Sequence, residues 1–517
     1  METTQIVDES LRKVTKGAGI ILLGTVLGLG LAFVSKIIVI RYITLDEYGV
    51  FSLALVLIGV FGSLALLGLE GGATRYIAFF RGKGDEEKVR GTILSSIQIA
   101  LVASLSFAVI AFFASDLIAT NIFHMEELSK PLKILSVAIP FSVLIAIFTS
   151  IFRGYDRADV RLYFNDILRN VLYLVFLGFA ILWGLSLLRV VYASVAAAVI
   201  SCIAFAVYAM RRPPLPIKKQ SSAILIRKEL LFFSLPLLTL GMFLLIMTWT
   251  DTLMLGYFKS PDAVGLYNGA LPLAQLIPLP LGAMGFLFLP VISSLYSRDL
   301  TEEIGRNYKV VTKWIFSASL PVFLVLCLFP EVTLSFLFGS QYAEAASALR
   351  FLSLGFLFHT FLGPAGLTLM GAGKTRLLMW ISLFGAVLNV ILNSALIPRL
   401  GIEGAAIASM ISYFAVCASC SAKLYQLYRI HPFTKNYLKP IVASGIIILA
   451  LYAIAKNLLL VTYWMLPLFV ILFLVVYAVS LLLTKSFDRE DIMILLSIEQ
   501  RTGIDATVVK NILRRFL

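Results

Sequence analysis

Residues 46–51 read Asp46-Glu47-Tyr48-Gly49-Val50-Phe51 and connect two apolar runs, 17–40 and 48–69. Residues 262–267 read Asp262-Ala263-Val264-Gly265-Leu266-Tyr267 and follow a later apolar run, 231–257. In both segments an acidic residue is followed three positions later by glycine and five positions later by an aromatic residue. Each segment is typical of a short turn that opens a helix, so the chain looks internally duplicated.

An offset of 216 to 217 residues recurs along six successive apolar runs. It aligns the pairs Glu86 and Glu302, Glu87 and Glu303, Arg90 and Arg306, Gly154 and Gly371, Arg157 and Lys374, and Gly184 and Gly401. Six membrane crossings restore the direction of the chain. We therefore expect two parallel six-helix lobes, related by a pseudo-two-fold axis along the membrane normal.

The composition requires a bilayer as solvent. Of 517 residues, 60% are hydrophobic and 14% are charged, and the mean hydropathy is +0.95. Soluble domains carry about 45–50% apolar and about 25% charged residues. A helix of about 20 apolar residues crosses the hydrocarbon layer. The sequence therefore predicts an all-α polytopic membrane protein.

Apolar runs separated by charged or Pro/Gly-containing breaks predict about fourteen transmembrane helices. Their approximate ranges are 17–40, 48–69, 91–114, 132–152, 163–183, 187–210, 231–257, 264–292, 309–330, 346–370, 376–397, 402–427, 438–459 and 462–484. The last two lie outside the repeat. Pro272, Pro278, Pro280 and Pro290 predict a broken span 8, and Gly71 and Gly72 predict a bend in span 2.

Lysine and arginine concentrate in alternate loops, which is typical of loops that stay in the cytoplasm. The basic segments are 12–16, 75–90, 153–161, 211–228, 298–313, 374–376, 423–439 and the C-terminal tail. Both termini are therefore expected in the cytoplasm. This topology also accounts for the net charge of +14, so no nucleic-acid partner is predicted.

The expected domains follow from the spans and the charged segments. They are a cytoplasmic tail at 1–16, an N-lobe at 17–211, a basic linker at 212–230, a C-lobe at 231–428, two extra helices within 429–484, and an amphipathic cytoplasmic tail at 485–517.

Two short motifs are not expected to carry chemistry. Residues 371–375 resemble the end of a phosphate-binding P-loop, but Thr368 occupies the position of its first glycine. The four cysteines lie inside apolar runs and include the pair Cys417 and Cys420. Neither a disulfide framework nor a transition-metal site is predicted.

Ionisable residues inside spans mark candidate sites, because a charge at the centre of a helix costs roughly 2.5–3.5 kcal/mol to insert. Lys36 lies in the outer third of span 1, and Asp251 lies in the outer third of span 7. The repeat offset aligns Lys36 with position 252, so both charges are expected at equal depth in one cavity. The alternative for Lys36 is snorkelling to the outer headgroups.

Further polar residues have more than one interpretation. Asn389 and Asn393 share one face of span 11, and Ser409 lies in span 12; they form a polar site or hold the two helices together. Arg75 and Arg153 lie near span ends, where the roles of a gate, a headgroup anchor and a solvated loop residue are all open.

Several ordered motifs are similar to a known family. They are Arg41-Tyr42 with Tyr48-Gly49 and Phe51, Arg75-Tyr76, Arg153-Gly154, Asp251 with Leu255-Gly256 and Val264-Gly265, and Asn389 with Asn393, Pro398, Gly401 and Gly404-Ala405-Ala406. Over residues 10–484 the chain resembles the polysaccharide-transporter branch of the multidrug/oligosaccharidyl-lipid/polysaccharide (MOP) flippase superfamily.

This resemblance implies that helices 1, 2, 7 and 8 line a central cavity and that the protein works by alternating access. It also implies a sodium site at Asp251, Asn389, Asn393, the Ala405 carbonyl and Ser409. Because Asn393 replaces a second carboxylate of the relatives, this site would hold a cation more weakly.

The leading hypothesis is a secondary transporter, not an enzyme, which flips a polyprenyl phosphate- or pyrophosphate-linked oligosaccharide to the outer leaflet. Lys36, Arg75 and Arg153 are the expected phosphate contacts, and Asp251 either binds a cation or pairs with Lys36. The alternatives are a cation-coupled multidrug exporter and, more distantly, a membrane-bound glycosyltransferase or polymerase. We expect a monomer in the cell membrane that contacts lipids and needs no cofactor. Coupling to a Na⁺ or H⁺ gradient, dependence on the membrane potential and uncoupled transport are all open.

Overall fold

The protein is helical in every part that the structure describes. The computed structural model describes residues 24–157, 159–211, 223–433 and 466–483. Within these ranges helices are joined by short turns and there is no β-strand. The first helix, Gly24–Tyr42, precedes helix α2.

The helices follow one another closely. Their bounds are α2 (Leu45–Leu66), α3 (Leu69–Gly82), α4 (Glu86–Leu117), the π-helix η1 (Ile118–Ile122), the 3₁₀ turn η2 (Glu126–Leu128), α5 (Ser129–Ser136), α6 (Ala138–Gly154), α7 (Asp159–Arg161), the π-helix η3 (Leu162–Leu168), α8 (Arg169–Leu182), α9 (Leu187–Arg211), α10 (Arg227–Phe258), α11 (Pro261–Ala274), α12 (Leu279–Tyr296), α13 (Thr301–Leu328), α14 (Pro330–Phe338), the 3₁₀ segment η4 (Ser340–Ala345), α15 (Ala346–Phe361), α16 (Ala365–Gly371), α17 (Thr375–Leu400), α18 (Ile402–Tyr428) and α20 (Leu466–Leu483).

Among the described residues, eight helices are long and apolar enough to cross a membrane, and there are up to twelve if each of four bent pairs counts as one span. These correspond in order to predicted spans 1 to 12. The bend in span 2 lies at Leu67 and Gly68, slightly before the predicted glycines, where both residues have positive φ. Span 8 is interrupted between α11 and α12, as its prolines predicted. Predicted span 13, 438–459, lies outside the described residues.

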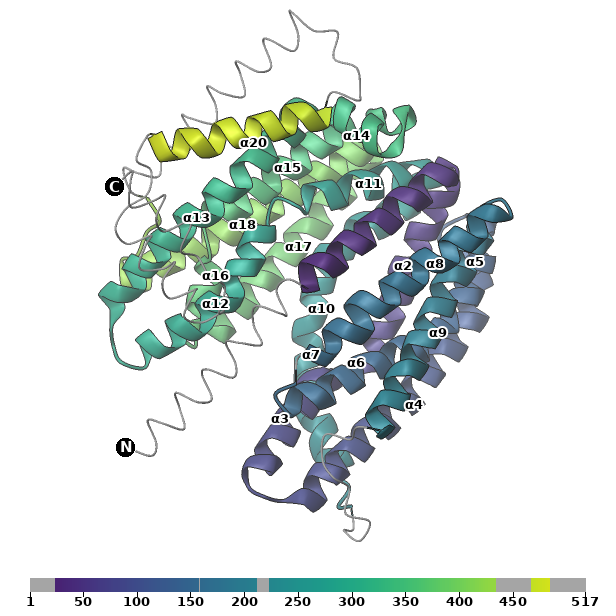
Figure 1. The fold of residues 1–517 in the computed structure, drawn as a ribbon, viewed down its shortest axis with the longest axis vertical. Helices are drawn as coiled ribbons and strands as arrows, with labels where there is room; N and C mark the ends of the chain where they lie inside the picture. The colour runs from purple at the N-terminus through teal and green to yellow at the C-terminus, as the bar shows by residue number, and fades with distance from the viewer. Residues whose placement is uncertain (1–23, 158, 212–222, 434–465, 484–517) are drawn as a thin grey trace, which may run out of the picture. The chain divides into compact units, whose positions relative to one another are not determined.

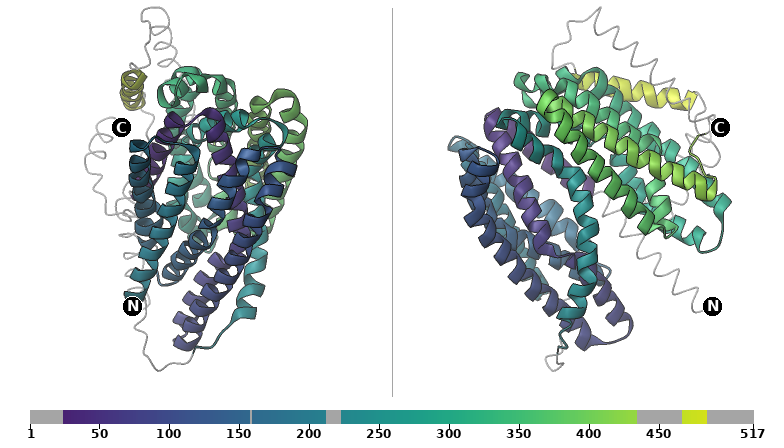
Figure 2. Two further views of the ribbon diagram at one scale, coloured as in Figure 1. Left: turned by 90° about the vertical axis from the view of Figure 1, so that its right-hand side faces the viewer. Right: turned by 180° about the vertical axis from the view of Figure 1, so that it is seen from behind.

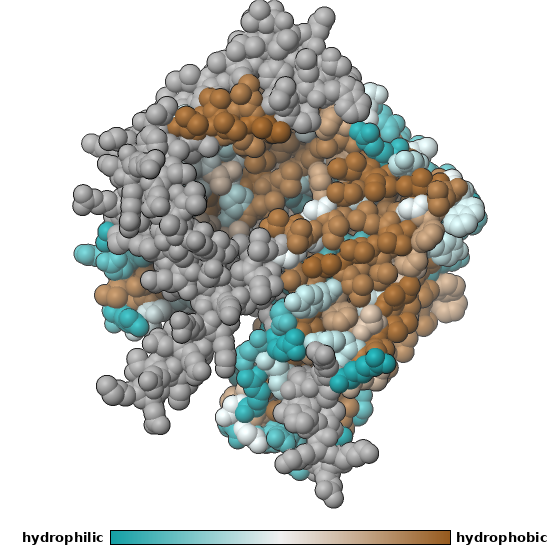
Figure 3. Space-filling model, in the orientation of Figure 1, coloured by the Kyte–Doolittle hydropathy of each residue, from teal (hydrophilic) through white to brown (hydrophobic). Residues whose placement is uncertain are grey.

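The surface is that of a protein surrounded by lipid. Large apolar side chains are widely exposed, including Phe113 at 76%, Leu182 at 77% and Phe232 at 85%. In Figure 3, brown hydrophobic side chains cover much of the coloured surface on the right of the view, and teal side chains gather mainly toward its upper and lower margins. A soluble monomer does not expose apolar surface on this scale, which confirms an integral membrane protein.

The chain divides into two compact units. The first unit comprises the described residues up to Gly265, and the second unit comprises the described residues from Leu266 onward. The division therefore falls near residue 265, because helix α10 packs against α2, α3 and α4 and so belongs to the first unit. The predicted lobe bounds, with the basic linker 212–230 between them, stay a prediction.

The internal packing of the two units repeats. In the first unit α4 packs on α3 and α6, and α9 packs on α6 and α8; in the second, α13 packs on α12 and α15, and α18 packs on α15 and α17. These neighbours lie side by side in Figures 1 and 2. Each pairing matches its counterpart six spans later, as a duplicated chain requires. The parallel two-lobe symmetry stays a prediction.

The opening motif 46–51 has a structural cause. Thr44 and Glu47 form a capping box at the start of α2, in which each side chain binds the other's backbone N–H. A Cβ on Gly49 would lie 1.9 Å from the Pro261 carbonyl oxygen, and a Cβ on Gly265 would lie 2.5 Å from the Leu45 carbonyl oxygen. The two repeat-related glycines thus allow the first turns of α2 and α11 to touch backbone to backbone.

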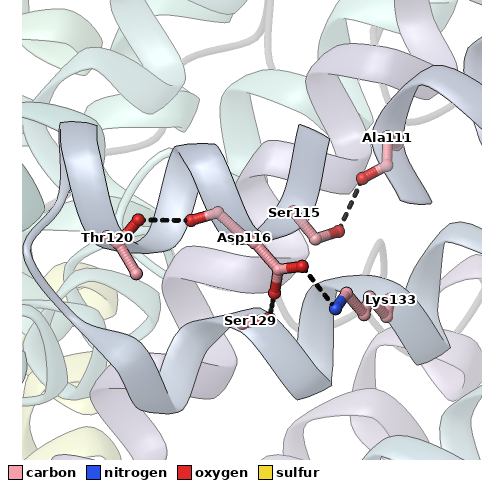
Figure 4. Close-up of polar contacts among 6 residues, drawn as sticks. All are labelled: Ala111, Ser115, Asp116, Thr120, Ser129 and Lys133. Carbon is pink, nitrogen blue, oxygen red and sulfur yellow. Dashed lines mark hydrogen bonds and ion pairs between the residues drawn. The ribbon is translucent and has the colours of Figure 1, made fainter. Parts of the chain in front are cut away.

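A polar cluster joins the end of α4 to α5, on the loop side predicted to be outside (Figure 4). Lys133 Nζ lies 2.6 Å from Asp116 Oδ2, and Ser129 donates to the other carboxylate oxygen. The side chain of Asp116 is exposed and that of its partner Lys133 is partly so, and solvent therefore screens the ion pair and leaves it a weak contact. Its importance is that it neutralises a lysine in a predicted outer loop.

Candidate functional site

A cavity of about 290 Å³ lies within the first unit. Its walls come from α2, α5, α6, α8, α9 and α10. Leucine, isoleucine, valine and alanine side chains make up much of the lining. The polar groups on its surface are Arg169, Ser63, Ser142, Ser194 and Trp249. A concave apolar site with a few convergent polar groups is the usual form of a small-molecule site.

Arg169 is the single charged side chain among the described residues that line the cavity. It is the first residue of α8 and lies near the middle of the candidate span Asp159–Leu182. The π-helix η3 directly precedes it. A π-helical turn contains an additional residue and so changes the face that the following residues present, which is why such turns are frequent at functional sites.

Hydrogen bonds hold this part of the chain in place. Asn170 Nδ2 donates to the Asp166 carbonyl at 2.7 Å and to the Gly28 carbonyl of the first helix at 3.3 Å. Ser201 Oγ on α9 donates to the Phe164 carbonyl at 2.6 Å. These bonds tie η3 to α9 and the start of α8 to the first helix, so the backbone on both sides of Arg169 is held in place.

No hydrogen bond or ion pair reaches the Arg169 side chain from any residue that the structure describes. The nearest acid in the sequence, Asp166, instead faces Arg161 at 3.8 Å. A centrally placed arginine costs several kcal/mol to insert unless it finds a partner. Its positive charge is thus available to a molecule that enters the cavity.

The remaining polar groups suit a hydroxylated ligand. Within the described chain, the Ser63 and Ser142 hydroxyls have no hydrogen-bond partner, whereas Ser194 donates to its own helix at the Val191 carbonyl, 2.8 Å away. The Trp249 ring packs over Gly59, where an added Cβ would lie 2.8 Å from the ring. The indole combines an apolar face with an N–H donor.

Two of the predicted site residues lie elsewhere. Lys36 does not line this cavity; its Nζ lies 6.0 Å from the centre of the Tyr48 ring, at the limit of a cation–π contact. Asp251 is 4% exposed on α10 between the buried residues Thr250 and Thr252. Their predicted shared cavity stays a prediction.

Arg75 and Arg153 are both exposed, Arg75 in the middle of α3 and Arg153 at the end of α6. The Arg75 guanidinium stacks on Phe233 of α10, with 4.1 Å between its Cζ and the ring centre. Arg153 lies in the last turn of α6, where a positive charge stabilises the helix dipole. Both therefore have local structural roles, and their predicted contact with substrate stays untested.

The residues predicted for a cation site in the second unit are brought together by α17 and α18. Asn393 Nδ2 donates to Asn389 Oδ1 at 3.1 Å, and Asn389 Nδ2 lies 3.3 Å from Ser409 Oγ. These three residues and Ala405 are at most 3% exposed. Such a chain of hydrogen bonds holds two membrane helices together, which is the alternative that the sequence left open.

Arg169 was not among the site residues predicted from the sequence. The residue lies six positions after the first residue of predicted span 5, so the cost of an intramembrane charge could have identified it. The repeat comparison pointed elsewhere, because its offset of 217 residues aligns Arg169 with Ala386. Because Ala386 is uncharged, aligning the two repeats does not single out Arg169.

Comparison with known families identifies the chain. The model of a family described as polysaccharide biosynthesis protein matches residues 14–296, more than half of the chain. The chain belongs to this family. The model of a second family, MatE, matches residues 236–394. Together these matches place the polysaccharide biosynthesis family member within the MOP superfamily, as its motifs predicted.

Curated relatives match over shorter segments. An uncharacterized membrane protein of Methanocaldococcus jannaschii is 31% identical over 33% of this chain and 34% of its own length. A probable low-salt glycan biosynthesis flippase, Agl15 of Haloferax volcanii, is 26% identical over 32% and 35%. A probable multidrug resistance protein NorM of Bacillus cereus is 30% identical over 36% and 42%. The matches thus span about a third of the length of the first of these relatives.

Solved structures share the fold over most of the chain. The lipid II flippase MurJ, in an inward closed conformation, aligns with a TM-score of 0.68 at 15% identity, covering 89% of this chain and 97% of its own. An inward-facing multidrug resistance MATE family transporter aligns with a TM-score of 0.62 at 18% identity, covering 79% and 92%. The MurJ- and MATE-like fold is therefore confirmed.

Proposed function

We propose that this protein is a flippase that moves a lipid-linked oligosaccharide from the inner to the outer leaflet by alternating access. The lipid is a polyprenyl phosphate or pyrophosphate, and the glycan is destined for a surface polysaccharide. One observation carries the proposal: the described lining of the cavity combines an arginine, serine hydroxyls and a tryptophan without any carboxylate. These groups complement a ligand that is both anionic and hydroxylated.

The size of the cavity fits part of such a ligand. Its volume of about 290 Å³ is at the lower end of small-molecule pockets, which run from about 300 to 1,000 Å³. It accommodates a sugar ring or a diphosphate rather than a whole oligosaccharide. The lipid tail would remain in the bilayer, against the exposed apolar surface of the helices.

A cation-coupled exporter of small drugs is the second candidate, because probable multidrug resistance proteins are among the relatives. Drugs of this class are usually cationic. At an effective dielectric constant of 20, a cation about 4 Å from the Arg169 guanidinium would be repelled by about 4 kcal/mol. The cavity chemistry therefore favours the flippase. A glycosyltransferase or polymerase is the more distant candidate. Such an enzyme needs clustered carboxylates in a sizeable loop, whereas the described helices of this chain are joined by short turns.

The proposal includes the cellular setting. The protein acts in the cell membrane with both termini in the cytoplasm, functions as a monomer, needs no bound cofactor or nucleic acid, and exchanges substrate with membrane lipids. The alternation of basic loops along the sequence supports this topology.

Reconstituted protein tests the function directly. In proteoliposomes, we expect the full-length chain to move a polyprenyl-diphosphate-linked disaccharide between leaflets, measured by the accessibility of the sugar to an external lectin. Cells that express the same chain should retain ethidium as control cells do. Ethidium export without movement of the glycolipid would overturn the proposal in favour of the drug exporter.

We further propose that a Na⁺ gradient supports transport only weakly. Asn389, Asn393 and Ser409 supply neutral oxygens, whereas cation sites are strengthened by each added carboxylate. Asn393→Asp is therefore expected to make glycolipid movement more strongly stimulated by Na⁺ than in the wild type, with K⁺ replacing Na⁺ at constant ionic strength. Asn393→Gln is the matched neutral control. Equal stimulation of the aspartate variant and the wild type would count against this cation site.

A further inference from the structure

The fold holds the charged residue Arg169 in place, yet no described residue forms a hydrogen bond or an ion pair with its side chain. Its span has an apolar exterior, its helix is fastened by Asn170 and Ser201, and the nearest acid faces Arg161. The counterpart position in the second unit is the buried, apolar Ala386. If the duplicated fold needed this charge for its structure, both units would carry it. The Arg169 charge therefore has a role that belongs to the first unit alone.

The other residues that line the cavity indicate which kind of ligand it can bind. The cavity contributes two further donors that have no partner within the described chain, the Ser63 and Ser142 hydroxyls. No described lining residue bears a negative charge that would compete. The planar guanidinium fork can donate to two oxygens of a phosphoryl group at once, and hydroxyl donors can reach its other oxygens. The low-dielectric wall of the cavity strengthens each of these contacts.

We propose that Arg169, Ser63 and Ser142 form an anion site in the first unit, and that this site holds the phosphate or diphosphate of the lipid-linked substrate. The assignment rests on the proposed function, because an exporter of cations would have no use for the site. It also changes which residues carry the charge: the phosphate is held within the membrane-spanning part of the first unit by Arg169, not by the exposed residues Arg75 and Arg153.

A binding measurement tests the site without transport. Full-length protein in phosphatidylcholine nanodiscs is titrated with inorganic pyrophosphate by calorimetry. Arg169→Gln is expected to weaken binding roughly ten- to hundredfold, as expected for a lost charge-assisted hydrogen bond. Arg211→Gln makes the same change at an exposed position at the end of α9 and should leave binding unchanged. Ser63→Ala with Ser142→Ala gives a second, uncharged probe and should weaken it by a smaller factor.

A competition arm identifies the source of the phosphoryl group. Nanodiscs that contain a polyprenyl diphosphate should bind inorganic pyrophosphate more weakly than phosphatidylcholine nanodiscs, and Arg169→Gln should abolish the difference. Pyrophosphate binding that the lipid does not affect would overturn the assignment to the lipid substrate. Binding that survives Arg169→Gln unchanged would overturn the site.

The two proposals fail in different ways. Wild-type protein that moves the glycolipid while Arg169→Gln binds pyrophosphate normally would contradict the anion site and leave the flippase intact. Wild-type protein that binds pyrophosphate through Arg169 but moves no glycolipid would contradict the proposed flippase, and with it the assignment of this site to a lipid-linked substrate.

Discussion

Arg169→Gln is expected to reduce the movement of lipid-linked oligosaccharide roughly ten- to hundredfold, the cost of one charge-assisted contact to a phosphoryl group. The amount of folded protein in the membrane should not fall, because the change removes an intramembrane charge that has no partner among the described residues. The rate is measured in proteoliposomes as lectin-accessible sugar, after normalisation to reconstituted protein.

Arg169→Lys separates charge from packing. Lysine keeps the positive charge but loses the planar guanidinium fork, so we expect it to restore only part of the rate lost in Arg169→Gln. Arg211→Gln is the control for a general loss of positive charge. Equal impairment by lysine and glutamine would show that the shape of Arg169, rather than its charge, supports transport.

Gly49→Ala is expected to lower the melting temperature of the purified protein by several degrees. The new Cβ would lie 1.9 Å from the Pro261 carbonyl oxygen, and because this neighbour is backbone, helices α2 and α11 must separate. Overpacking typically costs about 1–3 kcal/mol. Gly265→Ala should have a similar effect, since its Cβ would meet the Leu45 carbonyl oxygen at 2.5 Å.

A thiol-reactive dye provides the measurement, because Cys202 and Cys420 are buried and become reactive on unfolding. Gly30→Ala is the matched control: its Cβ would have nothing within 4 Å. If Gly49→Ala and Gly30→Ala melt at the same temperature, the close contact between α2 and α11 is not needed for stability.

The sequence predicted the secondary structure of the described part well, because a bilayer leaves few choices. Backbone groups in hydrocarbon must be satisfied within the segment, so each long apolar run becomes a helix. Runs such as 187–210 and 402–427 therefore correspond closely to α9 (Leu187–Arg211) and α18 (Ile402–Tyr428). The least accurate boundary was the end of span 2, which continues through the bend to Gly82.

The candidate site could be predicted only in part. Asn389, Asn393 and Ser409 were placed together correctly, because residues four apart share a helix face and short interhelical loops keep spans 11 and 12 adjacent. Lys36 and Asp251 stood out as charges at matching depth, yet neither lines the described cavity. Depth along a helix follows from the sequence, but the direction of a side chain around the helix does not.

The sequence by itself determined the family and the apolar helices that cross the membrane, and it predicted the internal duplication, since each depends on local composition or on a constant spacing. Only the tertiary structure decided that α10 packs with the first unit, and that Arg169 faces a cavity beside Ser63 and Ser142. These features depend on the rotation of helices that are far apart in sequence, and on a π-helical turn whose additional residue no apolar periodicity reveals. Residues 46–51 show both contributions: their spacing revealed the repeat, and the packing revealed why Gly49 and Gly265 must be glycine.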